Sequence, residues 1–219
     1  LAVIAAFICL NACQKKSAAG GDTAALEARL VKMEKRVDKI IEVLSQAMGP
    51  GRPDPKDVYK LPIGAADIVE GPANAKVTIV ETFEFLCPYC WQFAPVISQI
   101  KATFPNDVRF VYKHLVIHGE PALPPALAAC AASKQDKFHD MSTAIFASIF
   151  TSEGKAIAEK STAPELEKLA ATLKLDMAKY KADVASAACQ AWLTSGEGLR
   201  DVGVTGTPSI YLNGKPVGP

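Results

Sequence analysis

Apolar positions recur in three patterns along the first half of this chain. From residue 26 to 47 they are spaced alternately by four and three, which is the heptad pattern of a coiled-coil helix. Residues 77–83 form a short apolar run rich in β-branched side chains and predict a buried strand. Residues 91–104 carry apolar side chains at helical spacing, and residues 108–115 predict the next strand. This order indicates a right-handed βαβ unit.

The second half is mainly helical and ends in a hairpin. Residues 209–217 predict two short strands around an Asn213-Gly214 turn. A further edge strand is expected at residues 58–63. The helical segments that the spacing predicts are 126–133, 138–150, 164–173 and 177–199. We therefore expect an α/β protein in which a block of helices interrupts the sheet-forming segments.

The overall composition excludes few classes of function. The 219 residues include 49% hydrophobic residues, which is enough for a medium-sized core. The formal net charge is +1 and no basic cluster stands out, so we expect no nucleic-acid partner. The most charge-dense stretch, residues 26–42, mixes both signs, as an exposed helix does.

The candidate chemistry lies where the strand at 77–83 gives way to the helix, in Cys87-Pro88-Tyr89-Cys90. A helix N-terminus presents unpaired N–H groups and the positive end of the helix dipole, which favour a thiolate. Pro88 fits there because a first-turn proline lacks only an N–H that has no partner in the helix. We expect Cys87, at the exposed tip, to be the attacking thiolate and Cys90 to resolve the mixed disulfide.

A zinc site and an inert structural disulfide are the alternatives for this cysteine pair. Zinc would need two further ligands at matching spacing, and neither the other cysteines nor the three histidines form a second paired motif. We therefore expect no metal. We also expect no dissociable cofactor, because a cysteine pair carries the electrons itself.

The strand, the Cys-Pro-Tyr-Cys motif, the helix and the later Thr207-Pro208 resemble the thioredoxin superfamily, and more narrowly its DsbA-like branch. The resemblance implies a thioredoxin fold with an inserted α-helical domain. It also implies that the Thr207–Pro208 peptide bond is cis. Thr207 and Pro208 are then expected to bind the substrate chain, together with Pro88 and Tyr89 of the motif.

The same resemblance assigns a role to an acidic residue. Family members carry a buried acid six positions before the first cysteine, and Glu81 matches this position whereas Glu84 does not. A buried Glu81 should have a raised pKa and exchange a proton with Cys90. The alternative is a glutamate at a strand end that reaches solvent.

The family pattern divides the chain into seven segments. They are a signal and lipobox segment (1–13), a tether (14–21), a coiled-coil helix (22–48), a Pro/Gly linker (49–57), the first half of the thioredoxin fold (58–120), the helical insert (121–200) and the second half of the fold (201–219). Relatives complete the last strand and add a final helix. We therefore expect a truncation at both ends, and one poorly covered face of the sheet.

The first residues predict export. Residues 1–10 are apolar but too few to span a membrane, and a polar stretch follows Cys13. Leu10-Asn11-Ala12-Cys13 resembles the lipobox of bacterial lipoproteins, which implies that Cys13 is lipidated and anchors the protein to a membrane. An ordinary signal peptide cut nearby and an uncleaved anchor are the alternatives. All three place the body of the protein in the periplasm or at the cell surface, where disulfides persist.

Four of the six cysteines remain if Cys9 leaves with the signal and Cys13 takes a lipid. Four thiols allow three pairings. With the motif cysteines as the redox pair, Cys130 and Cys189 would form a structural disulfide, and some DsbA-like relatives carry a second disulfide in this helical region. Both residues lie in alanine-rich helical runs, where buried free thiols are the alternative.

The heptad helix has to bury its apolar stripe against a partner. Leu at the a positions with Ile at a d position, plus apolar residues at flanking positions, favours more than two strands. We expect a homo-oligomer, specifically a trimer, through residues 22–48. The alternative is that the helix folds back onto its own domain. The Pro/Gly-rich residues 49–55 end the helix and support a separate stalk.

The functional hypothesis is an exported thiol–disulfide oxidoreductase that acts on protein cysteines. Its substrates would be cysteine-containing exported proteins, and a membrane redox partner would recharge it. The direction of electron flow, as oxidase or as isomerase or reductase, is left open. The alternatives are a non-catalytic lipoprotein that binds a partner, and a glutathione-dependent transferase or isomerase of related fold.

Overall fold

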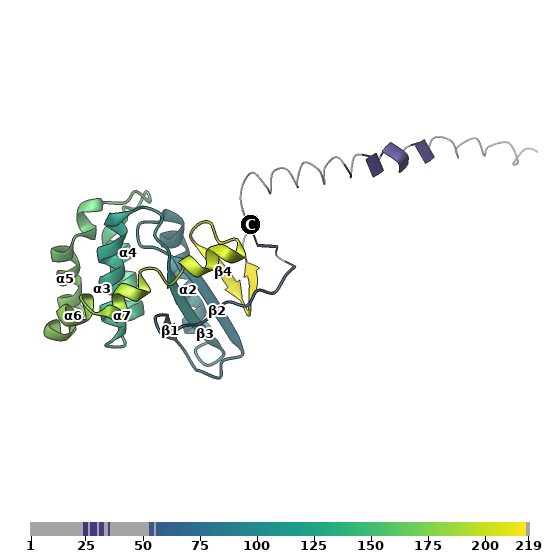
Figure 1. The fold of residues 1–219 in the computed structure, drawn as a ribbon. Coiled ribbons are helices and arrows are strands. Elements are labelled where there is room, and N and C mark those ends of the chain that lie inside the picture. Colours follow the sequence, from purple (N-terminus) through teal and green to yellow (C-terminus); the bar gives the residue numbers. More distant parts are fainter. Residues whose placement is uncertain are drawn as a thin grey trace, which may run out of the picture. The chain divides into compact units, whose positions relative to one another are not determined.

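The computed structural model describes residues 24–25, 27–29, 31–32, 35, 53–54 and 56–217 of the chain. The chain divides into two units, Leu1–Gly51 and Arg52–Pro219. In the first unit the described residues are helical and exposed, and Figure 1 draws them in purple. The predicted lipidation at Cys13, the export segment, the tether and the apolar seam of the coiled coil lie outside the described residues and stay predictions.

The described part of the second unit contains a five-stranded sheet in the order β1-β3-β2-β4-β5. Its strands are β1 (Ile68–Glu70), β2 (Val77–Phe83), β3 (Val108–His114), β4 (Ser209–Leu212) and β5 (Lys215–Val217). Val80 of β2 pairs with Val111 in the parallel neighbour β3 and with Tyr211 in the antiparallel neighbour β4. The central β2 is therefore hydrogen-bonded on both sides, which fixes the position of the segment that follows it.

The strand and hairpin predictions are confirmed except at one edge. The segment 58–63 was expected to form an edge strand, and this is wrong: β1 pairs with β3 instead. Pro62 lacks the N–H that a strand ladder requires, which disfavours pairing there. Tyr59 in this segment donates its N–H to the Gly214 carbonyl at 2.8 Å.

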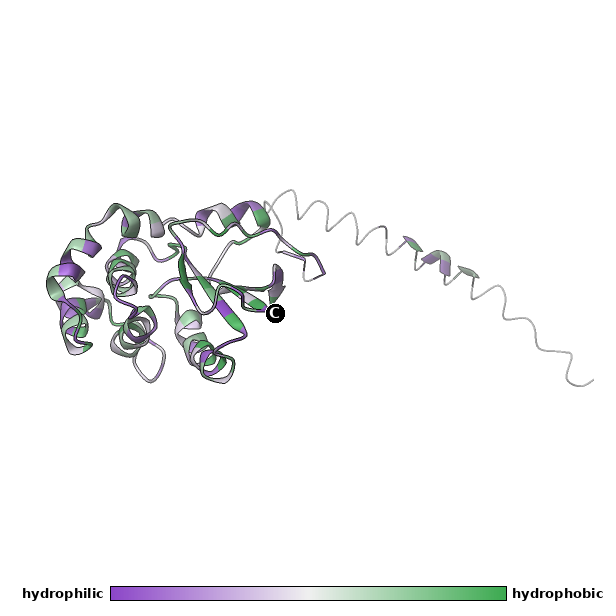
Figure 2. Ribbon diagram, turned by 90° about the horizontal axis from the view of Figure 1, so that it is seen from below, coloured by the Kyte–Doolittle hydropathy of each residue, from purple (hydrophilic) through white to green (hydrophobic). Residues whose placement is uncertain are grey.

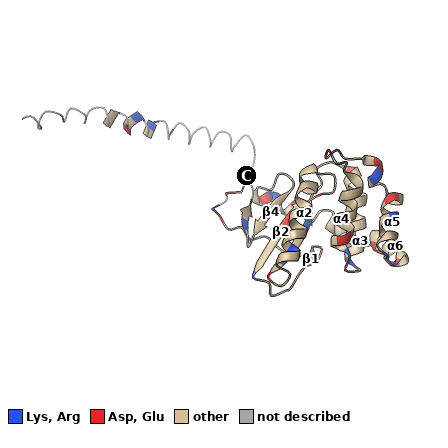
Figure 3. Ribbon diagram, turned by 180° about the vertical axis from the view of Figure 1, so that it is seen from behind, with Lys and Arg blue, Asp and Glu red and all other residues tan. Residues whose placement is uncertain are grey.

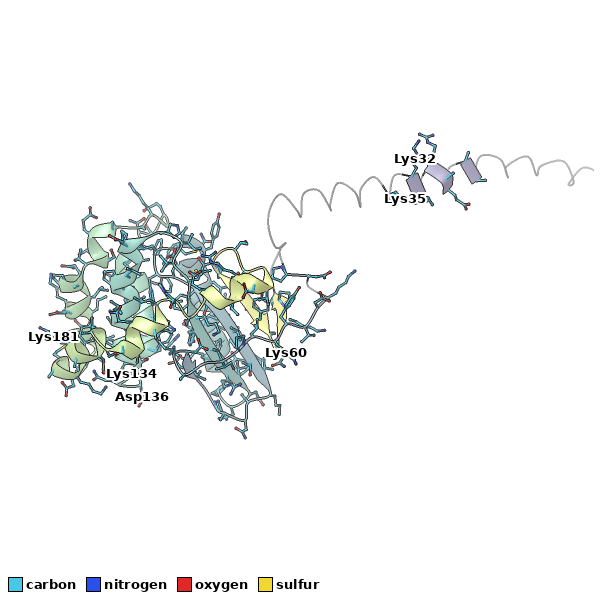
Figure 4. The ribbon with its side chains drawn as sticks, viewed as in Figure 1. Lys32, Lys35, Lys60, Lys134, Asp136 and Lys181 are labelled. Atoms are coloured by element: carbon cyan, nitrogen blue, oxygen red, sulfur yellow. A yellow bond between two sulfur atoms is a disulfide. The ribbon has the colours of Figure 1, made fainter. Side chains whose placement is uncertain are left out.

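The described part of the second unit also contains six α-helices. They are α2 (Pro88–Thr103), α3 (Leu123–Ser133), α4 (Phe138–Ile149), α5 (Ala163–Thr172), α6 (Met177–Val184) and α7 (Ala187–Trp192). Figure 1 shows α3, α4, α5 and α6 gathered at one end of the sheet, where they form the predicted helical insert. The labelled Lys134, Asp136 and Lys181 lie at the outer edge of this insert (Figure 4).

The last helical segment differs from its prediction, because 177–199 is not one helix. α6 ends at Val184, and α7 begins after Ser186, whose hydroxyl accepts the N–H of Cys189 at 3.3 Å. A serine that accepts this bond satisfies a free N–H at a helix start and so favours a new helix over continuation. The alanine-rich pattern on both sides hides this cap in the sequence.

The sheet face opposite α2 is covered, so the expectation of a poorly covered face is wrong. Gly196 leads into the 3₁₀ helix η3 (Glu197–Val202), and its N–H donates to the His114 carbonyl at 2.9 Å. A Cβ at Gly196 would lie 2.7 Å from that oxygen, which is too close for any other residue. The apolar cluster on this face comprises Val80, Val111, Leu115, Leu199, Val204 and Tyr211, with Tyr59 and Leu61 packed against it.

The main core lies between the sheet, α2 and the helical insert, and Figure 2 shows hydrophobic residues along the strands that face it. Phe83 of β2 packs against Tyr112 of β3, Phe138 of α4 and Trp192 of α7, with ring centroids 6.1 to 6.4 Å apart. Aromatic pairs at these separations add stabilisation beyond the area that they bury. The insert is therefore packed directly onto the strand that leads into the Cys-Pro-Tyr-Cys motif. Figure 3 shows that positive and negative residues are interspersed over the ribbon.

Cys130 of α3 and Cys189 of α7 form a disulfide, and both residues are buried. This is the pairing considered from the sequence, and buried free thiols at these positions are excluded. The bridge joins residues 59 positions apart, and it ties the first helix of the insert to the last.

We expect the Cys130→Ala/Cys189→Ala double variant to lose about 4 kcal/mol of unfolding free energy, since a loop of this length costs the unfolded chain that much entropy when it is closed. Urea unfolding of the oxidised parent and of the double variant measures the difference. Mutation is preferred to reduction because a reductant would also act on Cys87 and Cys90. A loss below about 1 kcal/mol would show that the bridge does not constrain the unfolded chain.

Candidate active site

The Cys-Pro-Tyr-Cys motif lies at the start of α2, four residues after the end of β2. Cys87 is the N-cap residue: its backbone is extended and its sulfur accepts the N–H of Cys90 at 3.4 Å. Pro88 is the first helical residue, where its missing N–H leaves no gap in the helix. Both cysteines are free thiols. The motif is therefore placed at the positive end of a helix, as its sequence position predicts.

Cys87 is less accessible than expected, because only 2% of its surface is exposed. The Thr207–Pro208 segment lies against it, and the Cys87 thiol donates to the Thr207 carbonyl oxygen at 3.2 Å. The Thr207–Pro208 peptide bond is cis. The expectation of an exposed tip is thus wrong for Cys87. The residue that protrudes from the motif is Tyr89, whose side chain is 67% exposed.

The pKa of Cys87 is lowered from 9.0 to about 6. The largest cause is the hydrogen bond from the Cys90 side chain, and burial opposes it. Further donors are the Thr207 side chain and the backbone N–H groups of Cys90 and Tyr89. Each of them stabilises the charged sulfur more than the neutral thiol. At pH 7 about nine-tenths of Cys87 is therefore thiolate.

The pKa of Cys90 is shifted in the opposite direction, upward. Burial, the hydrogen bond to Cys87 and the charges of Cys87 and Glu81 raise its pKa well above 9.0. A hydrogen bond from the backbone N–H of Glu84 lowers the pKa of Cys90 and so partly opposes these causes. One sulfur is thus ionised near neutral pH while the other holds its proton, which is the asymmetry that a nucleophile and a resolving thiol need.

Glu81 lies in the middle of β2 and is buried, so the alternative of a solvent-exposed strand end is wrong. Burial raises its pKa from 4.5 to about 8. Its carboxyl lines a small cavity beneath α2 together with Ala94 and Ile97 of that helix. Glu81 is therefore mainly protonated at pH 7, and a carboxyl whose pKa lies within about one unit of neutral pH can both give and take a proton.

Glu84 is the residue that sequence reasoning passed over. It is fully buried, and its carboxylate accepts the N–H groups of Ile117 at 3.0 Å and His118 at 3.2 Å. It also pairs with Nδ1 of the His118 ring. A second glutamate three residues after Glu81, in an otherwise apolar run, was the available signal. Glu84 fixes the loop after β3 beside the start of α2.

The other two histidines lie away from the two sulfurs and contact neighbouring segments. His114 is buried, and its Nδ1 lies 3.0 Å from the Leu193 carbonyl oxygen. His139 of α4 lies 3.2 Å from the Ser98 hydroxyl of α2 through its Nε2. Trp91, directly after Cys90, stacks on Phe150 with ring centroids 5.3 Å apart and so packs the start of α2 against the end of α4.

We expect the alkylation rate of Cys87 by iodoacetamide to rise with pH around a midpoint of about 6. The thiolate is the reactive form, so the rate is low below the pKa and reaches its plateau above it. Stopped-flow alkylation of the reduced protein between pH 4 and pH 9 (roughly the span that brackets both the shifted and the ordinary pKa) measures this. The Cys87→Ser variant is the control, because Cys90 alone should stay unreactive over the same range. A midpoint near 9 would contradict the prediction.

The described residues contain neither a cluster of metal-ligating side chains nor a membrane-spanning helix. No group of three or more His, Cys, Asp or Glu side chains is arranged to hold a metal ion. Among the helices in this part of the chain, none has both the length and the apolar character needed to cross a bilayer.

The curated proteins that resemble this chain in sequence are much longer than it, and only part of each one aligns with it. The chain is 30% identical over 152 residues to the Na(+)/H(+) antiporter NhaA 3 of Salinispora tropica, a match that covers 68% of this chain and 22% of that protein. It is 33% identical over 154 residues to the antiporter NhaA 1 of Salinispora arenicola, again covering 68% and 22%. The chain thus spans about a fifth of the length of the curated relatives it matches.

Several solved structures align with this chain over most of their own length. A thioredoxin-like oxidoreductase from Silicibacter pomeroyi has 25% identity and a TM-score of 0.59, with 70% of this chain and 84% of that one covered. Oxidised BdbD from Bacillus subtilis has 23% identity, a TM-score of 0.59 and coverage of 77% and 88%. ScsC from Proteus mirabilis in a transitional conformation has 19% identity, a TM-score of 0.56 and coverage of 94% and 90%. At identities of 23% and 19%, the last two structures are evidence for the fold alone.

The family assignment rests on the match to residues 65–219, which fit the family model described as Thioredoxin. This match covers more than half of the chain and includes both the cysteine motif and the cis Thr207–Pro208 bond. The expected helical insert is present between the two halves of the fold. The chain belongs to the thioredoxin family and has the fold of its DsbA-like thiol–disulfide oxidoreductases.

Proposed function

We propose that this protein is an exported thiol–disulfide oxidoreductase that acts on protein cysteines through a mixed disulfide at Cys87, resolved by Cys90. The observation that carries the proposal is the difference between the two sulfurs. Cys87 has a pKa of about 6, whereas the pKa of Cys90 is raised well above 9.0. A structural dithiol needs no such difference, but an attacking thiolate and a proton-bearing resolving thiol do.

The reaction follows from this difference. In the reducing direction the Cys87 thiolate attacks a substrate disulfide, and one substrate sulfur leaves as a thiolate. Cys90 then attacks the Cys87 sulfur, which forms the Cys87–Cys90 bond and releases the second substrate thiolate. Glu81 takes the proton that Cys90 loses, because its carboxyl is buried nearby and has a pKa of about 8. The oxidising direction is the reverse of these steps.

Substrate binding is assigned to the residues around Cys87. Tyr89 protrudes and offers an aromatic surface, Pro88 directly follows Cys87, and Pro208 follows Thr207, whose carbonyl oxygen accepts from the Cys87 thiol. In this proposal the backbone of Thr207 next to the cis bond pairs with an extended substrate chain, in the manner of an added strand. No dissociable cofactor is needed, since the electrons stay on sulfur throughout.

Location and assembly belong to the same proposal. Lipidation at Cys13 would hold the enzyme at a membrane, in the periplasm or at the cell surface, with exported proteins as substrates and a membrane redox partner for recharging. Self-association through residues 22–48 into a trimer would group the active sites and favour isomerase work. The mass in solution with and without residues 22–48 tests the trimer, and an unchanged monomer removes it.

The redox potential of the Cys87–Cys90 pair tests the direction of electron flow. A low pKa makes Cys87 a good leaving group, which favours donation of the disulfide to a substrate. Equilibration in glutathione buffers, read by mass after alkylation, gives the potential. Insulin reduction and refolding of scrambled ribonuclease then separate a reductase from an isomerase. A protein that is inactive in both assays and cannot oxidise a reduced client would be a binding module instead.

A further inference from the structure

A cavity of about 30 Å³ lies beneath the first half of α2. Ala94 and Ile97 form its roof, and they lie four and seven residues after Cys90 on the same face of the helix. Glu81 of β2 and Tyr112 of β3, which are opposite each other in the sheet, form its floor. The wall comes from α4 of the helical insert. The cavity is therefore shared between the redox helix, the sheet and the insert.

Polar atoms around this cavity are without partners. The Ser142 hydroxyl of α4 and the Tyr112 hydroxyl are both buried, and neither has a hydrogen-bond partner among the described residues. A buried hydroxyl without a partner is unfavourable, and native proteins satisfy such groups with internal water. The cavity has room for about two water molecules and offers them several polar partners. Its chemistry therefore fits bound water.

His139 of α4 connects the cavity to the surface. Its ring lines the cavity, the residue is only half-buried, and its Nε2 is held 3.2 Å from the Ser98 hydroxyl. Burial and then the charge of Lys101 lower the pKa of His139, which favours the neutral imidazole and the release to solvent of any proton that it receives. The charges of Glu70 and Asp140 raise the pKa of His139. The Glu70 carboxylate is itself paired with the Lys101 ammonium group at 2.5 Å.

We propose that the cavity holds a water chain that carries protons between Glu81 and solvent, with His139 as the proton-accepting residue at its outer end. This inference rests on the proposed function. When Cys90 forms its bond to Cys87 and the substrate leaves as a thiolate, the proton of Cys90 moves to the Glu81 carboxylate. Glu81 has to release it before the next cycle, and the cavity water passes it to His139 and on to solvent.

The titratable groups that face Glu81 are consistent with this route. They are Cys90 from α2, Tyr112 from β3 and His139 from α4. Burial, then Glu70 and Glu81, raise the pKa of Tyr112, so its hydroxyl stays neutral and orders water without taking the proton away. Cys90 is the source of the proton. His139 is then the group in this set that combines a basic nitrogen with partial exposure.

The first test follows the proton on Glu81 directly and needs no enzymatic activity. Near neutral pH the protonated Glu81 carboxyl gives an infrared C=O band that shifts when deuterium replaces the proton, and Glu81→Gln assigns this band. We expect Ser142→Val, which fills the cavity, to slow the deuterium exchange by about tenfold or more. The matched control is Ser148→Val on the same helix, outside the cavity, and it should exchange like the parent. Equal rates for both variants would overturn the proposal.

The second test uses His139→Gln, whose amide can keep the contact with Ser98. We expect the step in which Cys90 resolves the mixed disulfide to slow by about tenfold, and added imidazole to restore it. In a Glu81→Gln background the same substitution should have no further effect, because both residues act on one proton. A slow variant that imidazole does not rescue has only lost packing, and the relay is then wrong. The infrared readout keeps this outcome separate from a failure of the proposed function, which would appear as exchange activity independent of Cys87.

Discussion

Replacing Cys87 with serine is expected to lower the rate of thiol–disulfide exchange by at least about a thousandfold, because a serine hydroxyl stays protonated near neutral pH and is a poor nucleophile toward sulfur. The N-cap position itself tolerates the change, since serine is a favoured capping residue and can accept the same N–H of Cys90. The loss should therefore be chemical and leave the unfolding free energy nearly unchanged. Insulin reduction and urea unfolding of the same preparation measure both quantities.

Two substitutions at Cys90 separate its two roles. Cys90→Ser should still attack substrate but not release it, so that one mixed disulfide per chain accumulates and is seen by mass. Serine also keeps a donor toward the Cys87 sulfur, whereas Cys90→Ala removes the largest cause of the lowered pKa. We therefore expect the Cys87 pKa to stay near 6 in Cys90→Ser and to rise toward 9.0 in Cys90→Ala. Equal pKa values in the two variants would show that the backbone N–H groups alone stabilise the thiolate.

Replacing Asp67 with alanine is expected to cost about 3 to 5 kcal/mol of unfolding free energy. Asp67 holds the ammonium group of Lys113 through both carboxylate oxygens, at 2.7 and 2.8 Å, and also accepts the N–H of Gly64 at 2.7 Å. The two charged side chains are only 5% and 2% exposed. Removing the carboxylate leaves a buried positive charge without compensation, which is the costly way to break such a pair.

An exposed ion pair on the same unit provides the control. Lys76 and Asp107 are 3.1 Å apart with side-chain exposures of 84% and 51%. We expect Asp107→Ala to cost less than about 1 kcal/mol, because water screens this pair. The double variant Asp67→Ala/Lys113→Met should recover much of the loss, since no unpaired charge then remains buried. If Asp67→Ala and Asp107→Ala destabilise equally in urea, the pair at Lys113 is solvated and the reasoning fails.

The elements that could be predicted are those specified by neighbouring residues. The apolar run of β2, the start of α2 at Cys87 and the Asn213-Gly214 hairpin all follow from local patterns, and the structure contains each of them. The family signal of Thr207-Pro208 supplied the one long-range contact of the site, since this dipeptide lies 120 residues from Cys87. Local pattern and family motif together were enough to locate the redox pair.

What the sequence did not show depends on contacts between distant residues. Glu84 and His118 are 34 positions apart, and only the turn after β3 brings them together. The low exposure of Cys87 comes from the segment around Thr207, which periodicity in α2 cannot reveal. Helix 177–199 divides at Ser186 because a side-chain cap competes successfully with continuation of the helix. In each case tertiary packing or a single hydrogen bond overrides an uninterrupted pattern.

The buried disulfide between α3 and α7 constrains the order of steps in folding. Cys130 and Cys189 are almost completely buried once the insert is packed, so an oxidant has to reach them while these helices are still apart. Thiol–disulfide exchange requires access to the sulfur, which a closed core denies. The bond between Cys130 and Cys189 is thus expected to form before the packing of α3 against α7 is complete.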